Sequence, residues 1–169
     1  MANASLDELL DKYDDKTSQR AEEIKAQVSE EDQFIQDFVQ ARDEVIEPAL
    51  DKFKSQLEGR GHQAYIIKDD PGWDSVKSLP VEPSITLKIE LKKAQDPRDP
   101  NYGFRDVPSF GFRVNRRTKK IWSHESTIGQ GHGGHAGSRG EYTLKEITPQ
   151  LVESEALGFL KNLLKEHGV

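Results

Sequence analysis

The chain has 169 residues, of which 34% are hydrophobic and 32% are charged, and its net charge is -6. This length suits one domain, or one domain with an appended helix, and the polar composition indicates a small core. The absence of cysteine excludes disulfides, thiolate metal sites and cysteine nucleophiles. Without a secretory signal or ~18 consecutive apolar residues, the chain is expected to be cytoplasmic and to have no membrane partner.

Residues 1–60 are expected to form an acidic helical arm, because they contain sixteen acidic and eight basic residues. Ser5 and Glu8 have the spacing of a capping box, which predicts the start of a short first helix. After a polar stretch at residues 14–18, apolar residues recur at steps of three and four up to Leu57. This periodicity is typical of one face of a long helix.

Pro48 is expected to interrupt the long helix, because it has no amide hydrogen to donate. The pattern fits two helices, at 18–46 and 48–58, as well as it fits one kinked helix. In either case, Gly59 and Gly61 should end the helical region, since glycine readily adopts the left-handed conformation that follows a helix.

Five strands are expected after residue 60, with no helix between them. They are predicted at residues 63–68, 84–92, 109–115, 119–126 and 141–147. The second of them alternates without a break, since Ile85, Leu87, Ile89 and Leu91 are separated by polar residues. The loop at 69–83, which is rich in proline, is expected to fold Trp73 back over the core.

The chain is expected to end in a helix that Thr148 caps and that has Pro149 in its first turn. Consecutive strands joined by short loops form an antiparallel meander. The sequence therefore predicts an α+β fold with a meander of four to five strands packed on the C-terminal helix. The long N-terminal helical arm, which could form a coiled coil, occupies residues 1–60, and one compact domain occupies residues 61–169.

The segment at residues 127–140 is rich in glycine and lies between the last two predicted strands. Gly129, Gly131 and Gly134 have the spacing of a dinucleotide-binding loop, but no helix follows them to bind a phosphate. The segment is therefore interpreted as a mobile hairpin connection.

The same segment raises the possibility of a metal site. His132 and His135 are three residues apart, and His124 lies just before the segment. Imidazole is a common ligand of divalent transition metals, so these histidines are the candidate ligands of a metal-dependent enzyme. Glycine-rich backbone is a poor scaffold for such a site, so no cofactor is expected as the primary interpretation.

A second alternative is binding of nucleic acid or nucleotides through basic strand ends at residues 105–120. The candidate anion-binding residues are Arg113, Arg116, Arg117, Lys119, Lys120 and Arg139. The segment at 109–114 partly resembles the aromatic RNP1 stretch of RNA-recognition motifs. It lacks the preceding basic residue and glycine, and Phe110 and Phe112 are therefore expected to belong to the core.

The primary hypothesis is a non-enzymatic interaction module without catalytic residues. A helix of about 40 residues would extend ~60 Å, well past a domain of this size. Its excess apolar surface is expected to bind a protein partner or a second copy of the chain, as a homodimer. The candidate partner-binding residues are Ile24, Val28, Ile35 and Phe38. The compact domain would present the Gly/His-rich hairpin.

Overall fold

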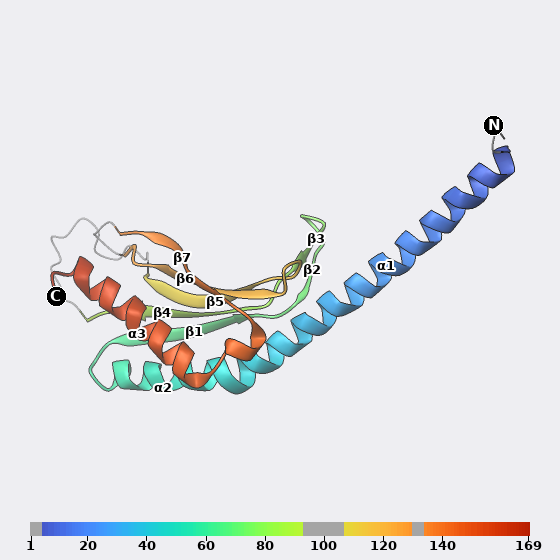
Figure 1. Cartoon of the computed structure of the whole chain (residues 1–169). Coiled ribbons are helices and arrows are strands. Elements are labelled where there is room, and N and C mark those ends of the chain that lie inside the picture. The colour runs from blue at the N-terminus through green and yellow to red at the C-terminus, as the bar shows by residue number, and fades with distance from the viewer. Residues whose placement is uncertain (1–4, 93–106, 130–133) are drawn as a thin grey trace.

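The computed structural model describes residues 5–92, 107–129 and 134–169, and it confirms the predicted α+β fold. A long helix leads into a five-stranded antiparallel sheet, and a C-terminal helix packs against that sheet (Figure 1). The elements are α1 (Leu6–Ala41), the π-helical turn η1 (Arg42–Ile46), α2 (Glu47–Glu58), β1 (Gln63–Asp69), β2 (Gly72–Asp74), β3 (Leu79–Val81), β4 (Ser84–Glu90), β5 (Ser109–Asn115), β6 (Lys120–Ser126), β7 (Ala136–Tyr142), the 3-10 turn η2 (Leu144–Glu146) and α3 (Pro149–Glu166).

The predicted capping box begins α1. The amide of Ser5 donates to the Glu8 carboxylate at 3.2 Å, and the amide of Glu8 donates to the Ser5 hydroxyl at 3.2 Å. The helix then continues through residues 14–18, so the expected separate first helix is wrong. Polar residues do not end a helix when their side chains stay in water and no glycine or proline is present.

The helical region is also continuous near Pro48, but it changes its winding there. The π-helical turn at Arg42–Ile46 precedes α2, and Pro48 lies in the first turn of α2. Because Pro48 has no amide hydrogen, it cannot continue the ladder of helical hydrogen bonds, and the change of winding lies directly before it. Of the two alternatives, two helices or one kinked helix, the structure has one helical region, with a π-helical turn before Pro48.

The five-stranded sheet has the order β1-β4-β5-β6-β7, and each neighbouring pair is antiparallel. The first four predicted strands correspond to β1, β4, β5 and β6. The predicted loop at 69–83 instead contains a small hairpin of β2 and β3, which extends beyond one end of the sheet (Figure 1). Trp73 lies in this hairpin and is 66% exposed, so the expectation that it covers the core is wrong.

The last predicted strand is displaced along the sequence. Strand β7 covers Ala136–Tyr142, and the predicted residues 144–146 form a 3-10 turn capped by Thr143. The last five residues of the segment interpreted as a loop, 136–140, therefore belong to a strand, which pairs with β6 through a bulge between Ser123 and His124. Glycine has no side chain, so this segment shows no alternation of apolar and polar residues in the sequence. The strand forms nevertheless, because its pairing with β6 uses backbone groups.

The core lies between one face of the sheet and the helices. Phe110 and Phe112 are fully buried there, as predicted, and the ring of Phe110 stacks on that of Phe159 in α3 at 5.7 Å. The C-terminal part of α1 contributes Phe38, and α2 contributes Leu50. None of the helices in the described ranges combines the length and apolar composition needed to span a membrane.

Candidate functional site

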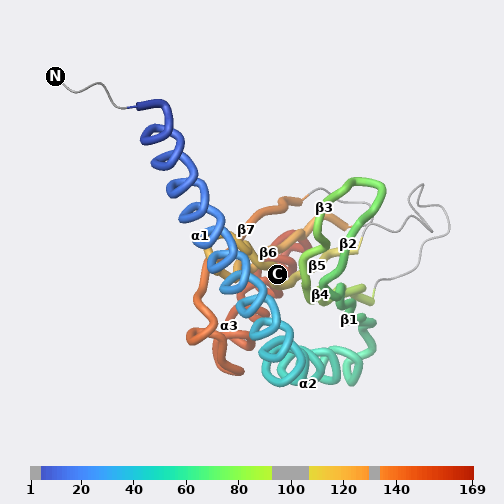
Figure 2. Tube along the Cα trace, turned by 90° about the vertical axis from the view of Figure 1, so that its right-hand side faces the viewer, coloured from blue at the N-terminus to red at the C-terminus, as the bar shows by residue number. Residues whose placement is uncertain are grey.

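The N-terminal part of α1 projects from the rest of the molecule, as both Figure 1 and Figure 2 show. Every residue from Ser5 to Glu30 is exposed, and at ~1.5 Å per residue this stretch extends about 38 Å. Of the described residues within the helical arm predicted at residues 1–60, only this stretch projects, and from here on the term arm refers to Ser5–Glu30. The residues that follow it in α1, from Phe34 onwards, pack into the core.

An apolar stripe runs along the arm. Its large side chains are Leu6, Leu9, Leu10, Tyr13, Ile24 and Val28, and all of them are exposed. At ~100° per residue they fall within an arc of about 100°, which also contains Ile35 and Phe38. The same helix face is therefore buried near the sheet and exposed along the arm.

The structure separates the four predicted partner-binding residues into two pairs. Ile24 is 58% exposed and Val28 is 48% exposed, and both lie on the arm. Ile35 and Phe38 belong to the buried core of the same chain. Only the first pair is thus accessible to another molecule, because the core of the same chain already buries the second.

The predicted basic residues at the turn between β5 and β6 lie next to acidic residues of α1. Arg116 pairs with Asp32 at 2.8 Å and with Glu82 at 3.0 Å, and Lys119 pairs with Glu30 at 2.6 Å. Desolvation opposes the charge of Arg116, but the hydrogen bonds that its guanidinium donates to both carboxylates outweigh desolvation and raise the pKa of Arg116. The acidic helix therefore neutralises part of this basic cluster.

Of the other candidate cations, Arg113 and Lys120 lie on the sheet face that also carries Trp122. Arg113 lies over the Trp122 ring at 5.7 Å, Arg117 is exposed beside the same turn, and Lys120 is half-buried. Arg139 is not part of the cluster, because its side chain points under the sheet toward α3. Arg105 lies outside the described residues. The structure thus brings together Arg116, Arg117 and Lys119 but not the full predicted set.

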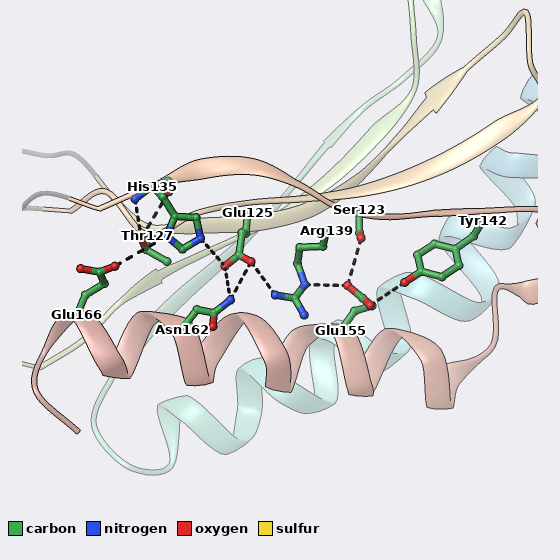
Figure 3. Close-up of polar contacts among 9 residues, drawn as sticks. All are labelled: Ser123, Glu125, Thr127, His135, Arg139, Tyr142, Glu155, Asn162 and Glu166. Atoms are coloured by element: carbon green, nitrogen blue, oxygen red, sulfur yellow. Dashed lines mark hydrogen bonds and ion pairs between the residues drawn. The ribbon is translucent and has the colours of Figure 1, made fainter.

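Arg139 belongs instead to a polar network between the sheet and α3, shown in Figure 3. Its Nε donates to Glu155 at 2.7 Å, and its Nη1 donates to Glu125 at 2.6 Å. Glu155 also accepts hydrogen bonds from the hydroxyls of Ser123 at 3.1 Å and Tyr142 at 2.6 Å. The guanidinium therefore bridges two carboxylates in a mostly buried layer.

Protonation within the network follows from these contacts. Burial opposes ionisation of Glu155, but hydrogen bonds from Tyr142 and Arg139 and the charge of Arg139 outweigh it, so the pKa of Glu155 is lowered. Burial and the nearby Glu155 carboxylate raise the pKa of Tyr142 to about 12. Near neutral pH, the Glu155 carboxylate is therefore ionised and the Tyr142 phenol is neutral, and the network ties α3 to β6 and β7.

The other end of the network contains His135. Its Nε2 lies 3.7 Å from Glu125, its Nδ1 lies 3.8 Å from Glu166, and its Nδ1 lies 3.3 Å from the Thr127 hydroxyl. Hydroxyl, imidazole and carboxylate have the order of a catalytic triad. However, Thr127 is fully buried and its oxygen already accepts the His135 amide hydrogen at 3.0 Å. The group therefore has no accessible nucleophile.

The candidate metal ligands are not assembled in the described structure. His124 lies on the opposite sheet face from Glu125, whereas His135 points toward α3 (Figure 3). Burial and the charge of Arg113 lower the pKa of His124 to about 4. His132 lies outside the described residues. Within the described ranges, no group of three histidines or carboxylates could hold a metal ion.

A groove of about 280 Å³ lies between α2 and α3. Its apolar lining includes Phe53, Leu57, Leu157, Leu160 and Leu164. Among the described residues that line it, Arg60 is the charged one and none is acidic. The groove therefore combines an apolar floor with a positive charge at its edge.

Sequence reasoning missed the network, although one signal was present. Glu155 and Asn162 are seven residues apart on α3, beside the buried positions of that helix. Asn162 donates to Glu125 at 3.0 Å, and Glu155 accepts from Arg139 at 2.7 Å. Both side chains therefore contact the network under the sheet. Residues seven apart lie on the same face of a helix, so the two polar side chains could be expected to form one row of contacts.

The chain matches no protein-family model, and no curated protein or solved structure was found to be similar to it.

Proposed function

We propose that this protein is a non-enzymatic, cytoplasmic interaction module whose arm binds a second copy of the same chain. The observation that supports the proposal is the apolar stripe between Leu6 and Val28, which is exposed along the whole arm. The cytoplasmic location is supported by the absence of cysteine from the sequence.

Burial of the stripe would provide the free energy for association. Each large apolar side chain that leaves water contributes ~1.5–3 kcal/mol. Helices in proteins also gain most of their stability from packing of an apolar face, and residues 5–30 lack that packing within one chain. A second surface that covers Leu10, Ile24 or Val28 would therefore stabilise both the arm and the complex.

A second copy is the proposed partner because one molecule carries two complementary surfaces. The arm is apolar and acidic, and the groove between α2 and α3 is apolar with Arg60 at its edge. The two alternative functions have weaker support. Arg116, Lys119 and Arg139 are engaged by carboxylates, and His124 and His135 lie on opposite faces of the sheet.

Analytical ultracentrifugation over a range of concentrations tests the proposal. The wild type should associate, and Leu10→Lys combined with Ile24→Lys should weaken association by about tenfold or more, because two stripe residues become charged. Gln19→Lys combined with Ala26→Lys is the matched control. It adds the same charge on the opposite side of the arm, where both residues are exposed. A wild type that stays monomeric at all concentrations would overturn the proposal.

A further inference from the structure

We infer that the groove between α2 and α3 receives the first turns of α1, Leu6–Tyr13, from a second copy of the chain. This inference rests on the proposed function, and it names the surface to which the arm binds. The argument uses the spacing of the arm's side chains, the charges of both surfaces and their positions in the molecule.

The spacing of the arm's apolar residues fits a groove. Leu6, Leu9, Leu10 and Tyr13 occupy positions i, i+3, i+4 and i+7 of one helix. This is the anchor spacing with which an amphipathic helix binds between other helices. The groove, at about 280 Å³, has room for a few such side chains, and its lining is mainly leucine and phenylalanine.

The charges at the tip of the arm are predominantly negative. Residues 7–15 contain five carboxylates, Asp7, Glu8, Asp11, Asp14 and Asp15, and one cation, Lys12. All of these side chains are exposed. An apolar groove with a positive edge would attract this segment, whereas a groove with acidic residues would repel it.

The surroundings of the groove have the complementary charge. Arg60 lines it, and the ammonium group of Lys92 donates to the Arg60 carbonyl at 2.9 Å. Lys161 is exposed one turn after Leu157 on α3. Two acidic residues of these helices are already paired, since Glu58 lies 3.6 Å from Lys54 and Glu153 lies 3.7 Å from Lys52.

The arm cannot reach the groove of its own chain. Figure 1 shows that the arm leaves at one end of the molecule, whereas the C-terminal parts of α2 and α3, which form the groove, lie at the other end. Because α1 is one continuous helix, the arm cannot fold back. The contact must form between molecules, and an exchange of arms between two copies closes the assembly as a dimer.

An arm that pairs with another arm is the main competing arrangement. Two copies of the 7–15 segment would bring acidic residues together, and their repulsion would be reduced by salt. Contact between the acidic tip and the basic edge of the groove is instead attractive, so it would be weakened by salt. The two arrangements therefore predict opposite dependences of association on ionic strength.

Crosslinking in the cysteine-free background tests the contact directly. Thr17→Cys places a thiol on the stripe just after Tyr13, and Gln56→Cys places one at the groove without removing a leucine. Full-length proteins that carry one change each would be mixed and treated with a short bis-maleimide. The expected product is a covalent pair of Thr17→Cys and Gln56→Cys chains. Ser55→Cys, an exposed position on the solvent side of α2, is the matched control.

The outcomes separate this inference from the proposed function. Crosslinking that favours Gln56→Cys over Ser55→Cys supports the groove. Crosslinking between two Thr17→Cys chains, without preference for Gln56→Cys, overturns the groove but preserves association through the arm. A wild type that is monomeric in the ultracentrifuge overturns both.

A negative charge introduced into the groove provides an independent measurement. Leu157 is 48% exposed, so Leu157→Glu should leave the fold intact while placing a carboxylate in the proposed binding surface. It should weaken association by about tenfold or more, and added salt should weaken association of the wild type. Ser154→Glu adds the same charge at an exposed position of α3 that does not line the groove. Equal association of both variants, or stronger association at high salt, would contradict the groove contact.

Discussion

The guanidinium of Arg139 occupies the space that a side chain at Gly158 would need. Gly158 lies within α3, and a Cβ built on it would overlap the Nη2 atom of Arg139. The guanidinium cannot move away freely, because Glu125 and Glu155 hold two of its nitrogens. A glycine inside a helix normally lowers the stability of the protein. At position 158 the absence of a side chain instead leaves the space in which the Arg139 guanidinium lies.

Gly158→Ala is therefore expected to destabilise the protein by about 1–2 kcal/mol. At a helix position with free space, the same glycine-to-alanine change would stabilise the protein by up to ~1 kcal/mol. The free energy of unfolding in urea measures the effect. In an Arg139→Ala background the overlap is gone, so the same change should be neutral or stabilising. Equal effects of Gly158→Ala in both backgrounds would show that Arg139 is not the cause.

Glu155→Gln is expected to lower the free energy of unfolding by about 2–4 kcal/mol. The amide keeps the shape of the side chain but leaves Arg139 with one carboxylate, and its nitrogen cannot accept a hydrogen bond. Glu153→Gln, two residues earlier on α3 and half-exposed, is the control and should change stability by less than about 0.5 kcal/mol. A comparable effect of both changes would mean that the network contributes no more than a surface pair.

The Glu155 carboxylate should also make stability sensitive to acid. Its pKa in the folded protein lies below the ordinary value of 4.5, so its stabilising contribution is complete above that pH. The contribution is lost as the pH falls through the lower folded pKa. The melting temperature of Glu155→Gln should therefore decrease less on acidification below pH 4.5 than that of the wild type. Parallel decreases in both proteins would argue against this assignment.

Arg116 is expected to contribute more to stability than Lys119. Arg116 is less exposed and bridges Asp32 on α1 to Glu82, which lies between β3 and β4. Arg116→Met should cost about 1–2 kcal/mol in urea unfolding, and Lys119→Met about 0–1 kcal/mol, because exposed single pairs contribute little. Similar costs for the two variants would indicate that the bridge adds nothing beyond an exposed pair.

His124 is expected to stay neutral in the folded protein down to weakly acidic pH. Burial and the charge of Arg113 lower its pKa to about 4, below the ordinary value of 6.5. Its ring signals in NMR spectra should therefore titrate near pH 4, and Arg113→Gln should move the midpoint upward. Because His124 takes up a proton less readily in the folded protein than in the unfolded one, the free energy of unfolding should decrease as the pH falls from 6.5 toward 4. A wild-type midpoint near 6.5 would contradict the buried position of the ring.

Patterns along the chain predicted the strands and helices whose side chains carry a regular signal. The alternation of Ile85, Leu87 and Ile89 determined β4, and Thr148 with Pro149 determined the start of α3. Strand β7 was misplaced because its glycines have no side chains to alternate. The polar network was not predicted either, because Glu155 contacts residues 13 to 32 positions away in the chain.

The sequence by itself determined most of the local elements, the acidic character of the N-terminal helix and the apolar residues that recur on one face of that helix. Only the tertiary structure decided which part of this face is buried, with Phe38 in the core and Ile24 and Val28 on the exposed arm. It also decided that Arg139 lies beneath the sheet and that Arg116 pairs with α1. Periodicity and capping act over a few residues, whereas burial and charge pairing depend on contacts between segments far apart in the chain.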